Sequence, residues 1–198
     1  MGEVAQVRFG GFGGQGIVLM GAILGDAAVR DGLWAAGSNS YGPQARGSAC
    51  RSEVILSGEP VDFPHVLEAD VLVVMSQEAY ERFLPEVRGE GVVIHDHPRV
   101  RPSEKGGPRH VAIPATHTAL EQLRNAQVAN MVLLAATVAL TGVVSKGSLR
   151  EALKEGVPSG MREINHEALE LGFALGKGAL SRMGGRFFSL RPMRPPAA

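Results

Sequence analysis

The sequence predicts an α/β fold: a Rossmann-like, doubly wound, mostly parallel sheet with helices on both faces and a helical C-terminal part. Three observations favour this fold class. The strand-like run Val7–Phe9 enters a glycine cluster that a helical pattern follows. The continuous apolar run Val71–Met75 is typical of a parallel strand that is buried on both faces. Strand and helix patterns alternate as far as Pro114, and beyond Pro114 the patterns are helical.

The N-terminal part is expected to contain one helix between strands. In that helix Leu19, Ile23 and Ala27 share one face, and small residues beside them allow close packing on a sheet. The expected elements are a strand at Val7–Phe9, a helix at Ile17–Arg30, a strand at Leu33–Ala36, a polar loop at Ser38–Ser48 and an alternating strand at Cys50–Ser57.

The middle of the chain continues the alternation of strand and helix. Ser76 is a good N-cap for a short helix, because its hydroxyl can accept a hydrogen bond from the first turn. The expected elements are a strand at Val71–Met75, a helix at Glu78–Leu84, a strand at Gly91–His95, a loop at Arg101–Pro108 and a strand at Val111–Ile113.

The C-terminal part is predicted to be helical, and we expect one domain over residues 1–184. The apolar stretch Val128–Val144 is interpreted as a buried helix, because it is short for a membrane span and contains Asn130. Residues 185–198 form a Pro/Arg-rich arm with the composition of a disordered segment. The expected helices are Thr116–Arg124, Val128–Leu140, Leu149–Lys154 and Arg162–Arg182, the last weakened by Gly172, Gly176 and Gly178.

Charge and cysteine content exclude several classes of function. The 198 residues contain 20 Lys and Arg and 20 Asp and Glu, so the chain lacks the basic excess of a nucleic-acid or membrane-surface binder. Cys50 is the single cysteine, which excludes an internal disulfide and an iron–sulfur cluster held by this chain alone. Together with an N-terminus that has no signal-peptide pattern, this favours the reducing cytoplasm.

The glycine cluster matches Gly11-x-Gly13-x-x-Gly16 between a strand and a helix. Glycines let the backbone approach a ligand, and free N–H groups at a helix start favour a phosphate. NAD is disfavoured, because the second strand ends without the acidic residue that grips the ribose. NADP remains an alternative ligand, because Arg46 or Arg51 could contact its 2′-phosphate. The other alternative is a tight strand-to-helix turn that binds no ligand.

Three further segments accompany the loop: Ser40-Tyr41-Gly42-Pro43-Gln44-Ala45-Arg46-Gly47, Ser52–Ser57 and Asn130-Met131-Val132. In this order the chain resembles the gamma subunit or domain of the 2-oxoacid:ferredoxin oxidoreductases over roughly residues 5–175. Two positions depart from the family pattern. Ser48 stands where a second glycine is common, and Ala135 stands where a glycine often follows Leu134.

The resemblance implies a division of labour between subunits. Such enzymes oxidatively decarboxylate a 2-oxoacid, transfer the acyl group to coenzyme A and pass two electrons to ferredoxin. Thiamine diphosphate with magnesium is then expected between partner chains of alpha and beta type, and the iron–sulfur clusters in cysteine-rich partner chains. A ferredoxin-like delta subunit is a further candidate partner. The gamma unit covers the active site and helps bind coenzyme A, and it has no turnover alone. The motif favours the 2-oxoglutarate type ahead of the pyruvate, branched-chain 2-oxoacid and indolepyruvate types. The isolated chain is expected to be able to self-associate.

The resemblance also implies candidate binding residues. No catalytic residue and no metal ligand is assigned to this chain. Tyr41 and Arg46 are interpreted as contacts to the ligand or to a partner subunit, with a solvated arginine as the alternative. Asn130 is expected either to bind the backbone of the glycine loop or to reach a ligand. The candidate coenzyme A contacts are Gly11, Gly13, Gly14, Gln15, Gly16, Tyr41, Arg46 and Asn130.

Two other groups receive structural interpretations. His95-Asp96-His97 could form a metal or acid–base cluster, but the favoured interpretation is the polar carboxyl end of a strand. Cys50 is not expected to be reactive, because no Lys or His beside it lowers its pKa. The rival functions are an NADP-dependent oxidoreductase and a non-catalytic assembly module.

Overall fold

The computed structural model describes residues 4–40, 49–103 and 107–184. The predicted arm at 185–198, Tyr41 and Arg46 therefore lie outside the described residues. The strands are β1 (Val4–Phe12), β2 (Trp34–Ser40), β3 (Ala49–Ser57), β4 (Ala69–Val74), β5 (Val87–Asp96) and β6 (Arg109–Ile113). The α-helices are α1 (Ile17–Arg30), α2 (Gln77–Phe83), α3 (Ala115–Leu123), α4 (Ala129–Thr141), α5 (Lys146–Gly156) and α6 (Arg162–Arg182). Short 3-10 turns are η1 (Leu84–Glu86), η2 (Ala126–Val128) and η3 (Ser159–Met161).

The six strands form one mixed sheet in the order β2-β3-β1-β4-β5-β6. The pairs β1–β4, β4–β5 and β5–β6 are parallel, whereas β3 runs antiparallel to both of its neighbours. The direction of β2 therefore matches that of β1. The prediction of a mostly parallel α/β sheet is confirmed, and five strands end at the same edge, where α/β folds place their ligands.

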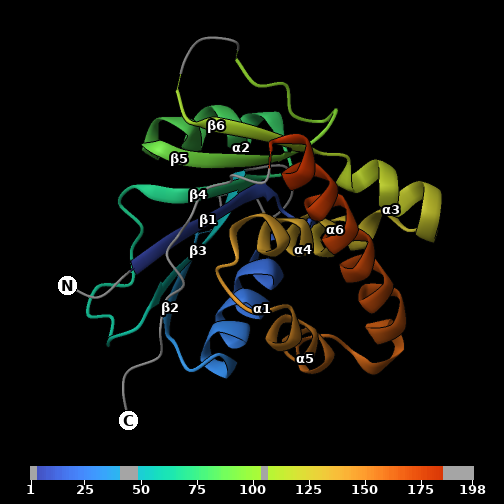
Figure 1. The fold of residues 1–198 in the computed structure, drawn as a ribbon, viewed down its shortest axis with the longest axis horizontal. Coiled ribbons are helices and arrows are strands. Elements are labelled where there is room, and N and C mark those ends of the chain that lie inside the picture. The colour runs from blue at the N-terminus through green and yellow to red at the C-terminus, as the bar shows by residue number, and fades with distance from the viewer. Residues whose placement is uncertain (1–3, 41–48, 104–106, 185–198) are drawn as a thin grey trace.

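Helices cover both faces of the sheet (Figure 1). On one face α2 packs over β1 and β4, and its Tyr80 and Phe83 belong to a small core with Leu72 and Val93. On the other face α1, α4, α5 and α6 share the main core with buried residues of β1, β3, β4, β5 and β6, and Ala35 of β2 packs against it. Alternate residues of β4 enter the two cores, which explains why its sequence is apolar without interruption.

Two details near the glycine loop correct the sequence-based boundaries. The loop predicted from Ser38 is wrong at its start, because β2 continues to Ser40 and pairs with β3 as far as Arg51. In addition, the strand beside β1 is β3, which starts where β1 ends. The arrangement therefore differs from the Rossmann order, in which the second strand lies beside the first and carries the ribose-binding acid at its end.

The glycines of α6 have a different role from the expected one. A Cβ on Gly172 would lie 2.2 Å from the carbonyl oxygen of Val132, and a Cβ on Gly176 would lie 2.7 Å from that of Ala136. These two glycines therefore let α6 approach α4 closely. The prediction that α4 is a buried helix is confirmed, and none of the helices in the described ranges is long and apolar enough to cross a membrane.

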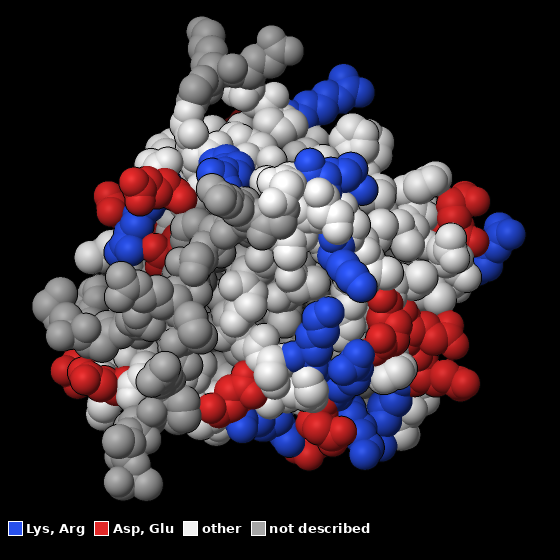
Figure 2. Space-filling view, viewed as in Figure 1, with Lys and Arg blue, Asp and Glu red and all other residues white. Residues whose placement is uncertain are grey.

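The balanced charge of the sequence appears as mixed ion pairs on the surface. Arg150 of α5 pairs with Glu170 of α6 at 2.6 Å, and Lys154 lies 3.9 Å from Glu151. Figure 2 shows blue and red side chains interspersed over this face, without a large area of one sign. A surface of this kind has no strong field for steering a polyanion.

Candidate functional site

The glycine loop joins the end of β1 to the start of α1. Gly14 and Gly16 have φ angles of 95° and 71°, which L side chains rarely adopt. Gly13 and Gly14 are exposed, and a Cβ on Gly14 would meet no atom within 4 Å. By contrast, a Cβ on Gly11 would lie 2.6 Å from Gln15 Oε1. Gly11 is thus needed for packing, and the open backbone of the loop is at Gly13 and Gly14.

Gln15 holds the loop in place through two hydrogen bonds of its side-chain amide. Its Oε1 accepts a hydrogen bond of 2.6 Å from the backbone N–H of Phe12, and its Nε2 donates one of 3.2 Å to the carbonyl of Met75. Met75 follows β4, so Gln15 ties the loop to the neighbouring strand. Its amide keeps one further N–H that these contacts do not use.

Asn130 holds the C-terminal end of the loop, at Gly16, through a hydrogen bond. The residue is 4% exposed, and its Nδ2 donates a hydrogen bond of 3.4 Å to the carbonyl of Gly16. A Cβ on Gly16 would lie 2.1 Å from that nitrogen, so Gly16 allows the start of α4 to approach the loop. Of the two alternatives expected for Asn130, the structure shows the contact to the loop backbone.

The segment with Tyr41 and Arg46 is located through its described flanks. Ser40 ends β2 and Ala49 begins β3, and Ala49 lies opposite Phe12 at the end of β1. Ser40 and Ala49, the described residues on either side of this segment, therefore lie at the edge that holds the glycine loop.

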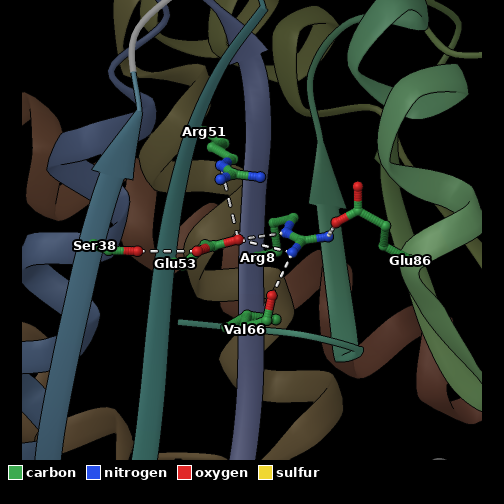
Figure 3. A network of polar contacts seen from close by, with 6 residues as sticks. All are labelled: Arg8, Ser38, Arg51, Glu53, Val66 and Glu86. Carbon is green, nitrogen blue, oxygen red and sulfur yellow. Dashed lines mark hydrogen bonds and ion pairs between the residues drawn. The ribbon is translucent and has the colours of Figure 1, made fainter. Parts of the chain in front are cut away.

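A buried ionic network lies in the middle of β1 and β3, and sequence reasoning did not predict it (Figure 3). Arg8 of β1 is 1% exposed and Glu53 of β3 is 2% exposed. Arg8 Nε donates to Glu53 Oε1 at 2.8 Å, and its other nitrogens donate to Glu86 and to the carbonyl of Val66. Ser38 Oγ donates to the second oxygen of Glu53 at 2.9 Å. The available signal was one charged residue within each of two strand-like runs, Arg8 and Glu53, but their pairing depends on the strand order.

The His95-Asp96-His97 segment forms structural contacts. Asp96 is fully buried and accepts hydrogen bonds from the backbone N–H and the hydroxyl of Thr116, at the start of α3. The favoured interpretation of a polar strand end therefore matches the role of Asp96. Within residues 4–40, 49–103 and 107–184, no group of three or more His, Cys, Asp or Glu side chains is arranged to hold a metal ion.

His95 is buried without a full set of hydrogen bonds. It is 2% exposed, its Nδ1 has no hydrogen-bond partner among the described residues, and its ring centroid lies 6.4 Å from that of His110. Burial, and then the nearby His110 and His97, lower the pKa of His95 from 6.5 to about 4. The folded protein therefore holds His95 neutral at pH values where the unfolded chain would protonate it.

We expect this histidine to make the protein less stable in mild acid. Between pH 6.5 and 4 the unfolded state binds the additional proton, so stability falls as the pH falls through this window. For His95 alone, the free energy of unfolding should drop by about 2 kcal/mol from pH 7 to pH 5. Urea titrations at the two pH values measure it. The variant His95→Gln should lose less stability over the same interval, and an equal loss in both proteins would contradict the assignment.

Cys50 lies in the core rather than at the site. It is 5% exposed, and burial raises the pKa of its thiol. A raised pKa keeps the sulfur protonated and unreactive. This agrees with the expectation that Cys50 is not a reactive thiol.

The comparisons with known proteins agree with this architecture. Residues 6–175 match the family model described as pyruvate ferredoxin/flavodoxin oxidoreductase. The 2-oxoglutarate synthase subunit KorC of Methanocaldococcus jannaschii is 43% identical over 176 residues, which cover 87% of this chain and 94% of that protein. The gamma subunit of a keto/oxoacid ferredoxin oxidoreductase from Geobacter sulfurreducens superposes with a TM-score of 0.81 at 38% identity, covering 89% of this chain and 98% of that one.

A third protein shares the fold at lower identity. The 2-oxoglutarate:ferredoxin oxidoreductase of Magnetococcus marinus, solved with 2-oxoglutarate, coenzyme A and succinyl-CoA bound, superposes with a TM-score of 0.81 at 24% identity. The match covers 98% of this chain and 33% of that one. The family match over most of the chain, the KorC relative and the gamma-subunit structure lead to one conclusion: the chain belongs to the pyruvate ferredoxin/flavodoxin oxidoreductase family, as a gamma subunit of a 2-oxoacid:ferredoxin oxidoreductase.

Proposed function

We propose that this chain covers the thiamine diphosphate site of partner subunits and helps bind coenzyme A while a 2-oxoacid, 2-oxoglutarate first, is converted to acyl-CoA. The observation that carries the proposal is the glycine loop. Its backbone is exposed at Gly13 and Gly14, and hydrogen bonds from the side chains of Gln15 and Asn130 hold it in place. The coenzyme A bound to the Magnetococcus marinus enzyme and the KorC relatives support the choice of ligand and substrate.

The loop would act by positioning. Backbone N–H groups at the start of α1 and the positive end of its dipole favour a phosphate. Because Gln15 and Asn130 hold the loop in place, a ligand bound there meets a preformed surface, and less entropy is lost on binding. The spare N–H of Gln15 and the side chains of Tyr41 and Arg46 are the remaining proposed contacts, with Gly11 and Gly16 shaping the loop. Holding the thiol of coenzyme A near the acyl intermediate is catalysis by proximity.

The redox and decarboxylation chemistry is assigned to other chains. A single, buried cysteine cannot ligate an iron–sulfur cluster. We therefore assign the clusters, the thiamine diphosphate and its magnesium to alpha- and beta-type subunits and to a ferredoxin-like delta subunit where one is present. The proposed compartment is the reducing cytoplasm, and the chain alone is expected to have no turnover.

Reconstitution with the subunits encoded beside this chain tests the role as a whole. We expect the alpha–beta pair alone to decarboxylate the 2-oxoacid but to form acyl-CoA slowly, and the gamma chain to restore acyl-CoA formation. Equal acyl-CoA formation without this chain would contradict the proposal. Normal coenzyme A kinetics in a complex that falls apart without the chain would favour an assembly module instead.

A substitution at Gly14 tests the loop itself. In the reconstituted complex Gly14→Leu should raise the KM for coenzyme A by about tenfold or more, because the side chain fills the space in front of the loop and strains its backbone. Decarboxylation measured without coenzyme A should be retained. Gly142→Leu is the matched control, since Gly142 also has a positive φ and open space but lies at the far end of α4. Equal coenzyme A kinetics in the two variants would exclude the loop contact.

A further inference from the structure

Arg51 lies at the same edge of the sheet as the glycine loop. In the strand register it stands opposite Gly10 of β1 and Ser40 of β2. It is two residues from Glu53 along β3, so the two side chains share one face of the sheet. Figure 3 shows Arg51 between the Arg8–Glu53 pair and the end of β1. Arg51 therefore lies close to the edge from which the glycine loop extends, on the face of the sheet that α2 covers.

Arg51 differs from Arg8 in how many of its donors are used. Arg8 is buried, and its Nε, Nη1 and Nη2 donate hydrogen bonds to Glu53, Glu86 and Val66 respectively. The side chain of Arg51 is 35% exposed, and its Nε lies 3.8 Å from Glu53 Oε1. That distance is an ion pair but is too long for a hydrogen bond. Among the described residues, no acceptor lies within hydrogen-bond distance of the Arg51 guanidinium.

Arg51 is the second cation of a network that contains two carboxylates, Glu53 and Glu86. One oxygen of Glu53 accepts from Arg8 and the other from Ser38, so Arg51 shares a carboxylate that a buried arginine already neutralises. The other acidic group of the network, Glu86, contacts Arg8 rather than Arg51. Glu53 thus lies close enough to orient Arg51, while the described residues leave the N–H donors of Arg51 available for an anion.

We propose that Arg51 binds an oxyanion of the ligand held at this edge, with Glu53 as its positioning residue. The inference rests on the proposed function of the glycine loop, and it adds a named cation to that site. A guanidinium recognises planar or tetrahedral oxyanions through paired N–H groups, so the ligand group is a phosphate of coenzyme A or a carboxylate of the 2-oxoacid. The described part of the glycine loop contains no cationic side chain, and Arg51 would supply this charge.

The experiment uses Arg51→Gln in the complex reconstituted with its partner subunits. We expect the KM for one anionic substrate, coenzyme A or 2-oxoglutarate, to rise at least tenfold, with kcat within twofold of the wild-type value. Arg51→Lys, which keeps the charge but loses the paired N–H geometry, should recover part of the loss. The thermal midpoint of the isolated chain should stay the same, because the 3.8 Å pair is partly exposed.

The choice of substrate identifies the oxyanion. If Arg51 contacts the 3′-phosphate of coenzyme A, the variant and the wild type should have equal KM values for dephospho-coenzyme A. If Arg51 contacts the carboxylate, the KM for 2-oxoglutarate should rise and that for coenzyme A should not. A rise for coenzyme A and dephospho-coenzyme A alike would assign Arg51 to the pyrophosphate.

Arg150→Gln is the matched control. Arg150 is exposed to a similar extent, 37%, and is ion-paired with Glu170 on the α5–α6 surface, so its loss should leave both KM values unchanged. KM values within twofold of wild type for both substrates in Arg51→Gln would overturn the inference. If Gly14→Leu still raises the KM for coenzyme A, only the role of Arg51 is wrong. If neither variant changes it, the coenzyme A role of the loop is wrong as well.

Discussion

Replacing Glu53 with glutamine is expected to lower the free energy of unfolding by about 3–5 kcal/mol. The substitution removes the charge that faces Arg8, a guanidinium that is 1% exposed. Glu86 remains within reach of Arg8, but its side chain is 43% exposed and therefore solvated. A buried cation without a full counterion carries most of its desolvation cost, and the folded state bears that cost. Urea unfolding of the isolated chain measures the loss.

A surface pair provides the control for this effect. Glu170→Gln removes the same type of group from its 2.6 Å contact with Arg150, yet both side chains are partly exposed, so the cost should stay below about 1 kcal/mol. Replacing both members of the buried pair, as in Arg8→Met with Glu53→Leu, should recover much of the stability lost in Glu53→Gln. A loss of equal size in Glu53→Gln and Glu170→Gln would show that burial of the pair is not what matters.

The same double variant separates stability from function. Without Glu53, Arg51 loses the counterion that the described residues supply to it. If the double variant folds as stably as the wild type but binds the anionic substrate of Arg51 more weakly, then the network acts on the site as well as on the fold. Buried ionic groups are often proposed to fix a specific conformation rather than to add stability, and the double variant tests this idea directly.

The predictable part of the structure is the part encoded by local patterns. The strand–glycine–helix order around Gly11 to Gly16 indicated the loop correctly, because turn and helix signals act over a few residues. The direction of β3 was not predictable in this way. An alternating strand such as Cys50–Ser57 has the same pattern whether it pairs parallel or antiparallel. Its direction follows from the connection to β2, which returns the chain at the same edge.

The side-chain contacts that hold the glycine loop and the neighbouring strands were predictable only in part. The position of Asn130 at the start of an apolar helix indicated a buried polar group that needs a partner, and the structure places that partner at Gly16. The contact of Gln15 with Met75 joins residues 60 apart in sequence, and that of Arg8 with Glu53 joins residues 45 apart. Such pairs depend on strand order and register, which a single sequence does not specify.

The glycines of α6 also make contacts that the sequence does not specify. Substituting one of them is expected to have a second large effect on stability. From the sequence, Gly172 appears as a weak point of the helix, because glycine lowers helix propensity by about 1 kcal/mol. In the structure Gly172→Ala should instead destabilise the protein by about 3 kcal/mol. The new Cβ would lie 2.2 Å from the carbonyl oxygen of Val132 and 2.7 Å from Ala135 Cβ, so α6 must move away from α4 along the main core.

Gly178 of the same helix is the matched control for this substitution. A Cβ there would meet nothing closer than the end of the Arg182 side chain at 3.6 Å. Gly178→Ala should therefore stabilise the protein by about 0.5–1 kcal/mol through helix propensity alone. Urea unfolding of the two variants should give shifts of opposite sign. Stabilisation by both would mean that α4 and α6 can separate at no cost. Because α4 also carries Asn130, a shift of α4 in Gly172→Ala should in addition weaken coenzyme A binding in the reconstituted complex, whereas Gly178→Ala should leave it unchanged.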